Sequence, residues 1–421
     1  MKTSRTMVLA ALCGAAGAPG ARGAAEGAQT PAGNAVVVAW NEKAYEIAYA
    51  EDQFLTFKGL RAFAMTNIAV HDALNAIDPV YQPYAPLDPD PLADPIAAAA
   101  QAAHDVLRSQ YPGQQPALDG LLADWIAQVP DGPGESGGIA LGQQSAAAIL
   151  ALREGDGWDF PGRYRFKREL GQYQTTPPWD GFVVQPGFRY AKPFGIEQPA
   201  QFRPAPPPRL DSALYAEAYN EVKDYGRVDS PVRTPDQTRY AIWWMEFAEG
   251  SVNRLARELV VDQQTPLWTA ARLFALMNMS LYDGYIAVWD AKYEHNHWRP
   301  YTAVRQAGRD PNPGTDPHAT WEPLRVTPPH TEYPSAHAAG CEASFEVLRR
   351  TFGDDFSFTM KTRSAPPDMP TRSFDRFSEA AVECADSRVR LGWHFRYATD
   401  RGLELGRAVS AFVVAHHLQP R

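Results

Sequence analysis

The chain has 421 residues and a formal net charge of −9 at pH 7, with 45% hydrophobic and 21% charged residues. This composition is ordinary for a folded globular protein and argues against disorder of the whole chain. The acidic balance argues against a basic groove for nucleic acid and against binding to an anionic membrane surface, so a local cluster of cations would be conspicuous.

The N-terminus has the pattern of a secretory signal. Lys2 and Arg5 precede a short apolar run at residues 7–18, and small residues follow around Gly23. The run is too short to cross a bilayer, and no later segment is apolar enough for a transmembrane helix. We predict that residues 1–23 are a signal peptide and that the protein is exported to the periplasm or the medium. The alternative is a fraying, Ala/Gly-rich N-terminus of a cytosolic protein.

The rest of the chain, residues 24–421, is predicted to be a single all-α domain. In its N-terminal half, residues 35–154, apolar residues recur at three- and four-residue spacings or in alanine-rich runs. The helical stretches expected here are 43–77, 95–107, 118–129 and 139–152. A Pro/Gly-rich and aromatic connector follows at 155–210. A long irregular stretch of this kind usually covers the core or shapes access to a site.

The C-terminal half, residues 211–421, is also predicted to be helical. Asp211 is expected to cap a helix that stops at Gly226, and Thr234 begins a capping-box pattern whose helix is expected to run to Gly250. Strand-like alternation is scarce. Further helices are expected at 267–293, 335–351, 378–390 and 401–417.

The first segment with candidate chemistry ends a helix and carries two cations. Lys292 and Arg299 are seven residues apart, two helical turns, so they can point the same way. Pro300 disfavours helical geometry at Arg299 and marks the end of the helix. Two cations on one face could close on an anion. A solvated basic face is the alternative for this segment alone.

The second segment begins a helix. Pro334 and Ser335 form a good helix start, which leaves unpaired backbone N–H groups and a hydroxyl at the positive end of a helix dipole. His337 in the first turn could exchange protons with a bound group. The alternative is a simple N-cap followed by a surface histidine.

The third segment ends a helix. Arg388 supplies a planar fork of donors suited to oxyanions, and His394 supplies an imidazole nitrogen that could bind a metal or attack phosphorus. Gly392 can end the helix so that both side chains converge. The alternative is a core histidine behind a helix C-cap.

Together the segments provide three cations, a hydroxyl with backbone donors, and two imidazoles. A small, highly charged tetrahedral oxyanion requires this combination of charge neutralisation and hydrogen-bond donors. A non-catalytic oxyanion-binding or structural protein is the weakest alternative, and it gains if the histidines prove to be buried away from the cations.

The pattern Lys-x6-Arg-Pro, Pro-Ser-x-His and Ser-Arg-x3-Gly-x-His at residues 292–394 resembles the signature shared by vanadium-dependent haloperoxidases and type 2 phosphatidic acid phosphatases. Upstream, residues 69–77 and 204–244 also look like bacterial haloperoxidase-like proteins. The resemblance implies an all-α fold of two packed helical bundles with long connecting loops. It also implies a vanadate cofactor, for which phosphate would compete.

The resemblance assigns roles by position. Lys292, Arg299 and Arg388 would hold the vanadate oxygens, assisted by Ser335 and the backbone N–H of Ala336. His394 would bind vanadium, and His337 would exchange protons with hydrogen peroxide. Lys292 would polarise the peroxide. The partners would be hydrogen peroxide, a halide and a small organic acceptor.

Two further positions favour a peroxidase. His330 lies where bromoperoxidases of the family carry His and the chloroperoxidase type carries Phe, and Trp289 lies where the chloroperoxidase type carries Trp near the halide. We favour bromide as the halide. The alternative function is a soluble exported acid phosphatase, in which His394 would accept the phosphoryl group. For Trp289 and His330 the structural alternatives are core packing and a polar loop residue.

The sequence departs from the family at two places. Ala336 stands where glycine is usual, and a left-handed backbone there would cost Ala roughly 1 kcal/mol or more. Ala398 stands where many members carry the Asp that orients the last histidine of the signature. We expect either Asp400 or a backbone carbonyl to orient His394 instead.

Two cysteines remain after removal of the signal. Cys341 is one turn after His337 and Cys384 one turn before Arg388, on helices that would converge on the same anion. We expect a Cys341–Cys384 disulfide, with two buried thiols as the alternative.

Overall fold

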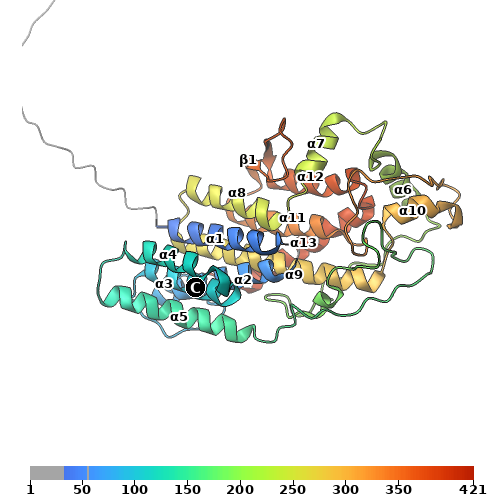
Figure 1. Ribbon diagram of the computed structural model, residues 1–421. Helices are drawn as coiled ribbons and strands as arrows, with labels where there is room; N and C mark the ends of the chain where they lie inside the picture. The colour runs from blue at the N-terminus through green and yellow to red at the C-terminus, as the bar shows by residue number, and fades with distance from the viewer. Residues whose placement is uncertain (1–32, 55) are drawn as a thin grey trace, which may run out of the picture. The chain divides into compact units, whose positions relative to one another are not determined.

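The computed structural model describes residues 33–421 apart from residue 55. The signal peptide predicted at residues 1–23 lies outside the described residues. From residue 33 onward the chain is one compact unit that is mostly helical, with a single two-stranded hairpin among the described residues (Figure 1). The expectation of an all-α fold is confirmed. No described helix has both the length and the hydropathy needed to cross a membrane.

The N-terminal bundle is formed by α1 to α5. Asp94 caps α3 by accepting hydrogen bonds from the backbone N–H groups of Ile96 and Ala97, with Pro95 at the first helical position. The stretch expected at 43–77 is two helices, separated by a turn in which Gln53 is left-handed. The helices are α1 (Ala35–Asp52), α2 (Lys58–Ile77), α3 (Pro95–Gln110), α4 (Gln115–Ile126) and α5 (Pro133–Leu152).

The C-terminal bundle is arranged around α9 (Leu267–His295), α11 (Ala336–Phe352), α12 (Phe377–Arg390) and α13 (Arg396–His416). The 29-residue α9 contacts α2 of the first bundle as well as α11 and α13 of the second (Figure 1). Most residues of α9 are buried, and they lie on every face of the helix. A helix that is apolar all round in this way belongs in the centre of a large core.

Two glycines allow α13 to pack very closely on α11. A Cβ atom at Gly406 would lie 2.3 Å from the carbonyl oxygen of Ala339, and one at Gly402 would lie 2.6 Å from that of Ser335. A Cβ atom cannot lie so close to a carbonyl oxygen, so only glycine at these two positions permits α13 to pack this closely on α11. The close packing fixes the first turn of α11, where Ser335 and His337 lie.

The connector at 155–210 contains only a short 3-10 helix, η2 (Pro186–Tyr190), in agreement with the irregular stretch expected. It is tied to α9 by Asp283. The buried carboxylate of Asp283 accepts hydrogen bonds from the backbone N–H groups of residues 194, 195 and 196 at 2.6–2.8 Å. The connector therefore runs along the helix that ends at the candidate site.

Short helices complete the structure, and three expectations fail here. The helix that ends at Tyr225 is capped by Ser212 and not by Asp211, because the Ser212 side chain accepts a hydrogen bond from the backbone N–H of Tyr215. The capping box of Thr234 is present, but its helix α7 (Pro235–Trp243) ends at Trp243 instead of reaching Gly250. A separate helix α8 (Ala248–Asp262) follows. The antiparallel hairpin of β1 (Asp355–Lys361) and β2 (Thr371–Arg376) was not expected. The remaining short helices are η1 (Pro112–Gln114), α6 (Ala213–Tyr225), α10 (Pro300–Gln306) and η3 (Ala307–Arg309).

Candidate oxyanion site

The first turn of α11 supplies the hydroxyl, a backbone N–H and one histidine. Ser335 is the N-cap, and its side chain accepts a hydrogen bond from the backbone N–H of Ala338 at 3.4 Å. Ala336 begins the helix and is not among the non-glycine residues with positive φ, so the expected left-handed strain is absent. His337 is buried, and its Nε2 has no hydrogen-bond partner among the described residues.

The end of α9 supplies a fully buried lysine. The Nζ of Lys292 donates to the backbone carbonyl oxygens of Thr331 and Glu332, both at 2.8 Å. An ammonium group has three donors, so these two bonds leave one N–H for a ligand.

Arg299 lies in the same site as Lys292 but, contrary to the prediction, it is not on the same helix. Helix α9 ends at His295, and Arg299 is extended, with φ −79° and ψ 154°, as the N-cap of α10. The two cations therefore do not share a helix face. The guanidinium of Arg299 donates to the backbone carbonyl oxygens of His330 and Trp393 at 2.9 and 2.8 Å.

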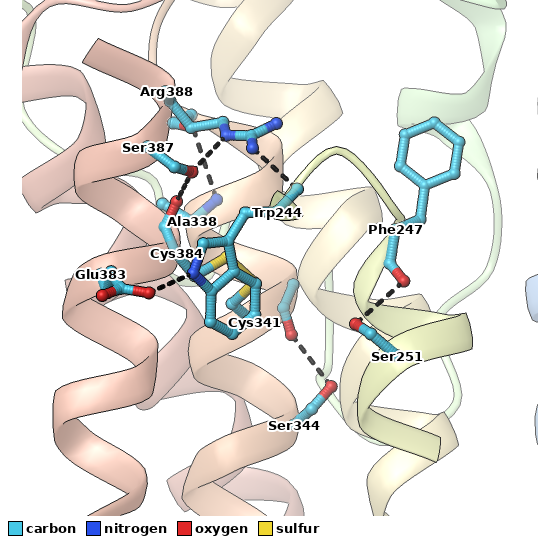
Figure 2. Close-up of a disulfide and its surroundings, with 12 residues drawn as sticks. Trp244, Phe247, Ser251, Ala338, Cys341, Ser344, Glu383, Cys384, Ser387 and Arg388 are labelled. Atoms are coloured by element: carbon cyan, nitrogen blue, oxygen red, sulfur yellow. Dashed lines mark hydrogen bonds between the residues drawn. A yellow bond between two sulfur atoms is a disulfide. The ribbon is translucent and has the colours of Figure 1, made fainter. Parts of the chain in front are cut away.

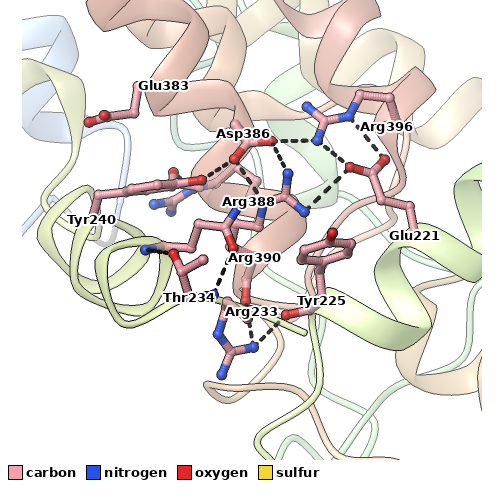
Figure 3. A network of polar contacts seen from close by, with 12 residues as sticks. Glu221, Tyr225, Arg233, Thr234, Tyr240, Glu383, Asp386, Arg388, Arg390 and Arg396 are labelled. Atoms are coloured by element: carbon pink, nitrogen blue, oxygen red, sulfur yellow. Dashed lines mark hydrogen bonds and ion pairs between the residues drawn. The ribbon is translucent and has the colours of Figure 1, made fainter. Parts of the chain in front are cut away.

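The end of α12 carries two arginines in contrasting surroundings. Arg390 forms a bidentate pair with Asp386 at 2.9 and 3.0 Å, in a network that includes Arg396 and Glu221 (Figure 3). Arg388 donates instead to the Ser387 hydroxyl and to the backbone carbonyl oxygen of residue 244 (Figure 2). The network holds α12 from one side, and Arg388 keeps donors for another partner.

His394 follows the helix end in the way expected. Gly392 has φ +78°, where a Cβ atom would lie 2.5 Å from the carbonyl oxygen of Gly226, and the chain turns there. A guanidinium has no acceptor, so in the 3.0 Å contact between Arg299 Nη1 and His394 Nε2 the imidazole nitrogen accepts. The ring proton of a neutral His394 is therefore on Nδ1.

Glu332 orients this ring. Its Oε1 accepts from His394 Nδ1 at 3.0 Å and from the backbone N–H of Phe395 at 2.9 Å. The expectation that Asp400 or a backbone carbonyl would do so is wrong, since Asp400 is exposed to solvent. Sequence reasoning missed Glu332, although a carboxylate five residues before His337, inside the second segment, was the available signal. Burial raises the pKa of Glu332 to about 8, against the opposing effect of Arg299 and Lys292.

The electrostatics of the site are dominated by buried positive charge. Burial lowers the pKa of Lys292 well below its usual range, that of Arg299 to about 10 and that of Arg388 to about 9. Within the described part of the chain, no carboxylate oxygen lies within 4.0 Å of the charged nitrogens of these three residues. Buried cations without ion pairs are strongly unfavourable unless an anion joins them.

The same cations converge on His394. Burial lowers the pKa of His394 well below its ordinary value, and Arg299, Lys292 and Arg388 each lower it further. Burial and Arg388 likewise lower the pKa of His337. Both imidazoles are therefore neutral at pH 7 and can accept a proton or bind a metal.

Trp289 and His330 lie beside this cluster. Their ring centroids are 5.2 Å apart, and His330 Nδ1 lies 3.0 Å from Arg299 Nη2. Trp289 also packs edge-on against Phe57, with centroids 4.7 Å apart. The two predicted halide-side residues are thus neighbours, one of them in contact with a candidate oxyanion ligand.

A disulfide joins Cys341 and Cys384, the pairing expected from the sequence (Figure 2). Both residues are fully buried. The bond links α11, one turn beyond His337, to α12, one turn before Arg388. It therefore fixes two of the three segments relative to each other.

Comparisons with known proteins agree with this geometry. The family model described as VCPO second helical-bundle domain matches residues 272–420, which contain all three segments. The vanadium chloroperoxidase of Curvularia inaequalis is 26% identical over 449 aligned positions, covering 80% of this chain and 74% of that protein. The chain is therefore similar to proteins of the vanadium-dependent haloperoxidase superfamily over most of its length.

Solved structures of this superfamily have the same architecture. The crystal structure described as the first bacterial vanadium-dependent iodoperoxidase is 25% identical and has a TM-score of 0.79, covering 92% of this chain and 98% of that one. An apo-type bacterial vanadium-dependent chloroperoxidase is 18% identical with a TM-score of 0.68 over 84% of this chain and 92% of that one, a likeness of fold alone.

The superfamily implies a vanadate cofactor, and the residues of this chain fit it. Among the residues that the structure describes, three buried cations lack carboxylate partners and the Nε2 of His337 is buried without a partner. The Nε2 of His394 is an acceptor. Neutral imidazole is a suitable ligand for a transition metal, and arginine and lysine neutralise its oxygen atoms. Glu332 supplies the outer partner that such a histidine ligand requires.

Proposed function

We propose that this protein is a vanadate-dependent haloperoxidase, in which hydrogen peroxide, a halide ion and a proton yield hypohalous acid and water. The observation that carries the proposal is the convergence of three buried, unpaired cations on His394, whose Nε2 is left as an acceptor. That arrangement favours a bound oxyanion with a metal at its centre over a structural role.

Each residue of the site would have a separate role in this reaction. Bound vanadate would supply Lewis-acid activation of peroxide. Lys292, Arg299 and Arg388 would neutralise the oxyanion. Glu332 would keep the Nε2 of His394 directed at the metal position by holding the proton on Nδ1. His337 would take a proton from peroxide at its unpartnered Nε2 and return it to the departing oxygen.

Within this function we propose bromide as the preferred halide. The support is the pair of Trp289 and His330, packed together beside Arg299. The neutral imidazole and the indole offer an N–H and an aromatic edge to an anion, and burial lowers the pKa of His330 well below its ordinary value.

We also propose that the protein is exported. Its N-terminus has the charged, apolar and small-residue pattern of a signal peptide. The disulfide between Cys341 and Cys384 is a bond that persists in oxidising compartments. N-terminal sequencing of the protein recovered from outside the cytoplasm tests this, and a start at residue 1 would contradict it.

Two assays on the purified protein test the reaction. The first measures bromination of a neutral cyclic diketone with hydrogen peroxide and bromide, with and without orthovanadate. The second measures hydrolysis of an aryl phosphate without vanadate. We expect vanadate-dependent bromination that inorganic phosphate inhibits and that His394→Ala abolishes.

The matched control is His416→Ala, which removes an exposed histidine from the last turn of α13. We expect it to keep full bromination. Phosphate ester turnover without any bromination would overturn the proposal in favour of a phosphatase, in which His394 accepts the phosphoryl group.

A further inference from the structure

A cleft of about 820 Å³ lies between the connector and the end of α9. Its lining includes Phe160, Tyr164, Arg165, Tyr190 and Tyr293. The volume is in the range of sites that enclose small molecules. The cleft is distinct from the oxyanion site, because none of the predicted vanadate ligands lines it.

Aromatic rings at the cleft are left in contact with solvent. Phe160 is 51% exposed and Tyr190 is 65% exposed, and their rings meet edge to face with centroids 6.1 Å apart. Elsewhere in the lining, the ring of Tyr164 packs against that of Tyr293, with centroids 5.8 Å apart. Large aromatic side chains gathered at a concave surface are typical of ligand sites.

The rim of the cleft is positively charged. Three exposed cations lie at every second position of one segment of the connector, Arg163, Arg165 and Lys167. All three line the cleft. Within the described residues none of them has a carboxylate within ion-pair distance, and no acidic residue lines the cleft. A chain with a net charge of −9 has ample carboxylates to pair with such cations, so an unpaired basic rim favours an anionic ligand.

The cleft is adjacent to the oxyanion site. Tyr293 lines the cleft and directly follows Lys292 on α9. Asn296 also lines the cleft, and its backbone N–H donates to the backbone carbonyl oxygen of Lys292 at 2.9 Å. A molecule in the cleft would therefore be held close to the place where the oxidant is formed.

We propose that this cleft binds the organic acceptor, and that the acceptor is a small phenol carrying a carboxylate. The ring would pack among Phe160, Tyr164 and Tyr190, and the carboxylate would meet the basic rim. The proposal rests on the proposed haloperoxidase function for its chemical step, but not for binding.

The chemical step is electrophilic substitution by the hypohalous acid that the protein makes. A carbon–halogen bond forms at a ring carbon ortho to the phenol hydroxyl, and the oxygen–halogen bond of the hypohalous acid breaks. The ring proton leaves and combines with hydroxide to give water. No other oxidant is needed.

Binding is tested without vanadate, peroxide or halide, so that the result does not depend on turnover. The probes are 4-hydroxyphenylacetate and its neutral amide, titrated by calorimetry into the full-length protein. We expect the acid to bind about tenfold more tightly than the amide, because only the acid carries a negative charge that can pair with the exposed cations of the rim. Arg163→Gln/Arg165→Gln/Lys167→Gln should remove that difference.

A variant with the same change in charge serves as the control. Arg239→Gln/Lys361→Gln/Arg376→Gln removes one half-buried cation from α7 and two exposed cations from β1 and β2, and none of the three lines the cleft. It should bind the acid as the unmodified protein does. Thermal unfolding of both variants shows that they are folded. Equal affinity for acid and amide, or equal loss in both variants, would overturn the proposal.

Turnover separates this inference from the proposed function. With vanadate, peroxide and bromide present, the cleft variant should raise the KM for the anionic phenol about tenfold and leave kcat and the diketone reaction unchanged. If no protein brominates either substrate, the proposed function fails while the binding result stands. If the cleft variant brominates both substrates normally, the acceptor site is elsewhere.

Discussion

Glu332 Oε1 lies 3.0 Å from Nδ1 of His394 and is the acceptor that fixes the tautomer of this ring. Removing the acceptor in Glu332→Ala should lower vanadate affinity by roughly 10–100-fold, because the ring loses its outer partner. Glu332→Gln keeps an oxygen in place and should retain most of the affinity at pH 7, below the pKa of about 8. Titration of vanadate into each variant provides the measurement.

The control for this pair is Asp400→Ala. Asp400 is exposed, and it was the carboxylate first expected to orient His394. Its replacement should leave vanadate affinity unchanged. An equal loss in the Asp400 and Glu332 variants would show that Glu332 has no special role.

His297 should make the protein less stable in acid. It is buried against the Tyr397 hydroxyl, and burial lowers its pKa from 6.5 to about 3. Below pH 6.5, His297 binds a proton in the unfolded chain but not in the folded chain. The contribution of His297 to the free energy of unfolding is therefore fully present above pH 6.5 and is lost as pH falls toward 3. The loss is about 1.4 kcal/mol per pH unit.

The measurement is the free energy of unfolding between pH 6 and pH 4 for the unmodified protein and for His297→Gln. The variant should show the shallower dependence on pH. His416→Gln, at an exposed position, should follow the unmodified protein. Identical slopes for all three proteins would mean that His297 is not buried in the neutral form.

The disulfide should stabilise the fold substantially. Cys341 and Cys384 are 43 residues apart, and closing a loop of that length in the unfolded chain is worth about 4 kcal/mol. Cys341→Ala/Cys384→Ala should therefore unfold at a clearly lower denaturant concentration. Since the bond links α11 to α12, vanadate affinity should fall as well. A variant with unchanged stability would refute the estimate.

The contact between α13 and α11 is sensitive to a single methyl group. Gly406→Ala would place a Cβ atom 2.3 Å from the Ala339 carbonyl oxygen, and overpacking of this kind costs about 1–3 kcal/mol. The control is Gly284→Ala in α9, where the nearest atom would be 3.7 Å away. Chemical denaturation of both variants compares them, and equal stability would show that α13 can move away from α11.

The halide preference can be tested at His330. His330→Phe removes the contact with Arg299 Nη2 and introduces the residue that the chloroperoxidase type carries at this position. The ratio of kcat/KM for bromide to that for chloride should fall. The ratio is measured at saturating peroxide and vanadate, and an unchanged ratio would mean that His330 does not act on the halide.

The sequence predicted the helical architecture and the convergence of the three segments, because helix periodicity, caps and motif spacing are local signals. It did not predict that Glu332 orients His394, since spacing along the chain does not show which residue of a neighbouring loop contacts the imidazole ring. It also misjudged Arg299, because the seven-residue spacing assumed a helix that ends at His295. Tertiary contacts decide such details.

The break between α7 and α8 and the β-hairpin were missed for different reasons. The break between α7 and α8 follows a strong capping box, and nothing in the local pattern shows where that helix stops. The hairpin had a visible signal. In β1, Phe358 and Met360 are buried while Ser357, Thr359 and Lys361 are exposed, which is the alternation of a half-buried strand. The strand is short, so its alternation was not recognised between the longer helical patterns.

The Cys341–Cys384 bond has a consequence for the lifetime of the catalyst. Hypohalous acid reacts readily with thiols, and thiolates are the first protein groups to be lost to oxidants. The two sulfur atoms one turn from His337 and Arg388 are already joined to each other. The proposed product therefore meets no free thiol at these two positions, and self-inactivation by sulfenic acid formation beside the site is avoided.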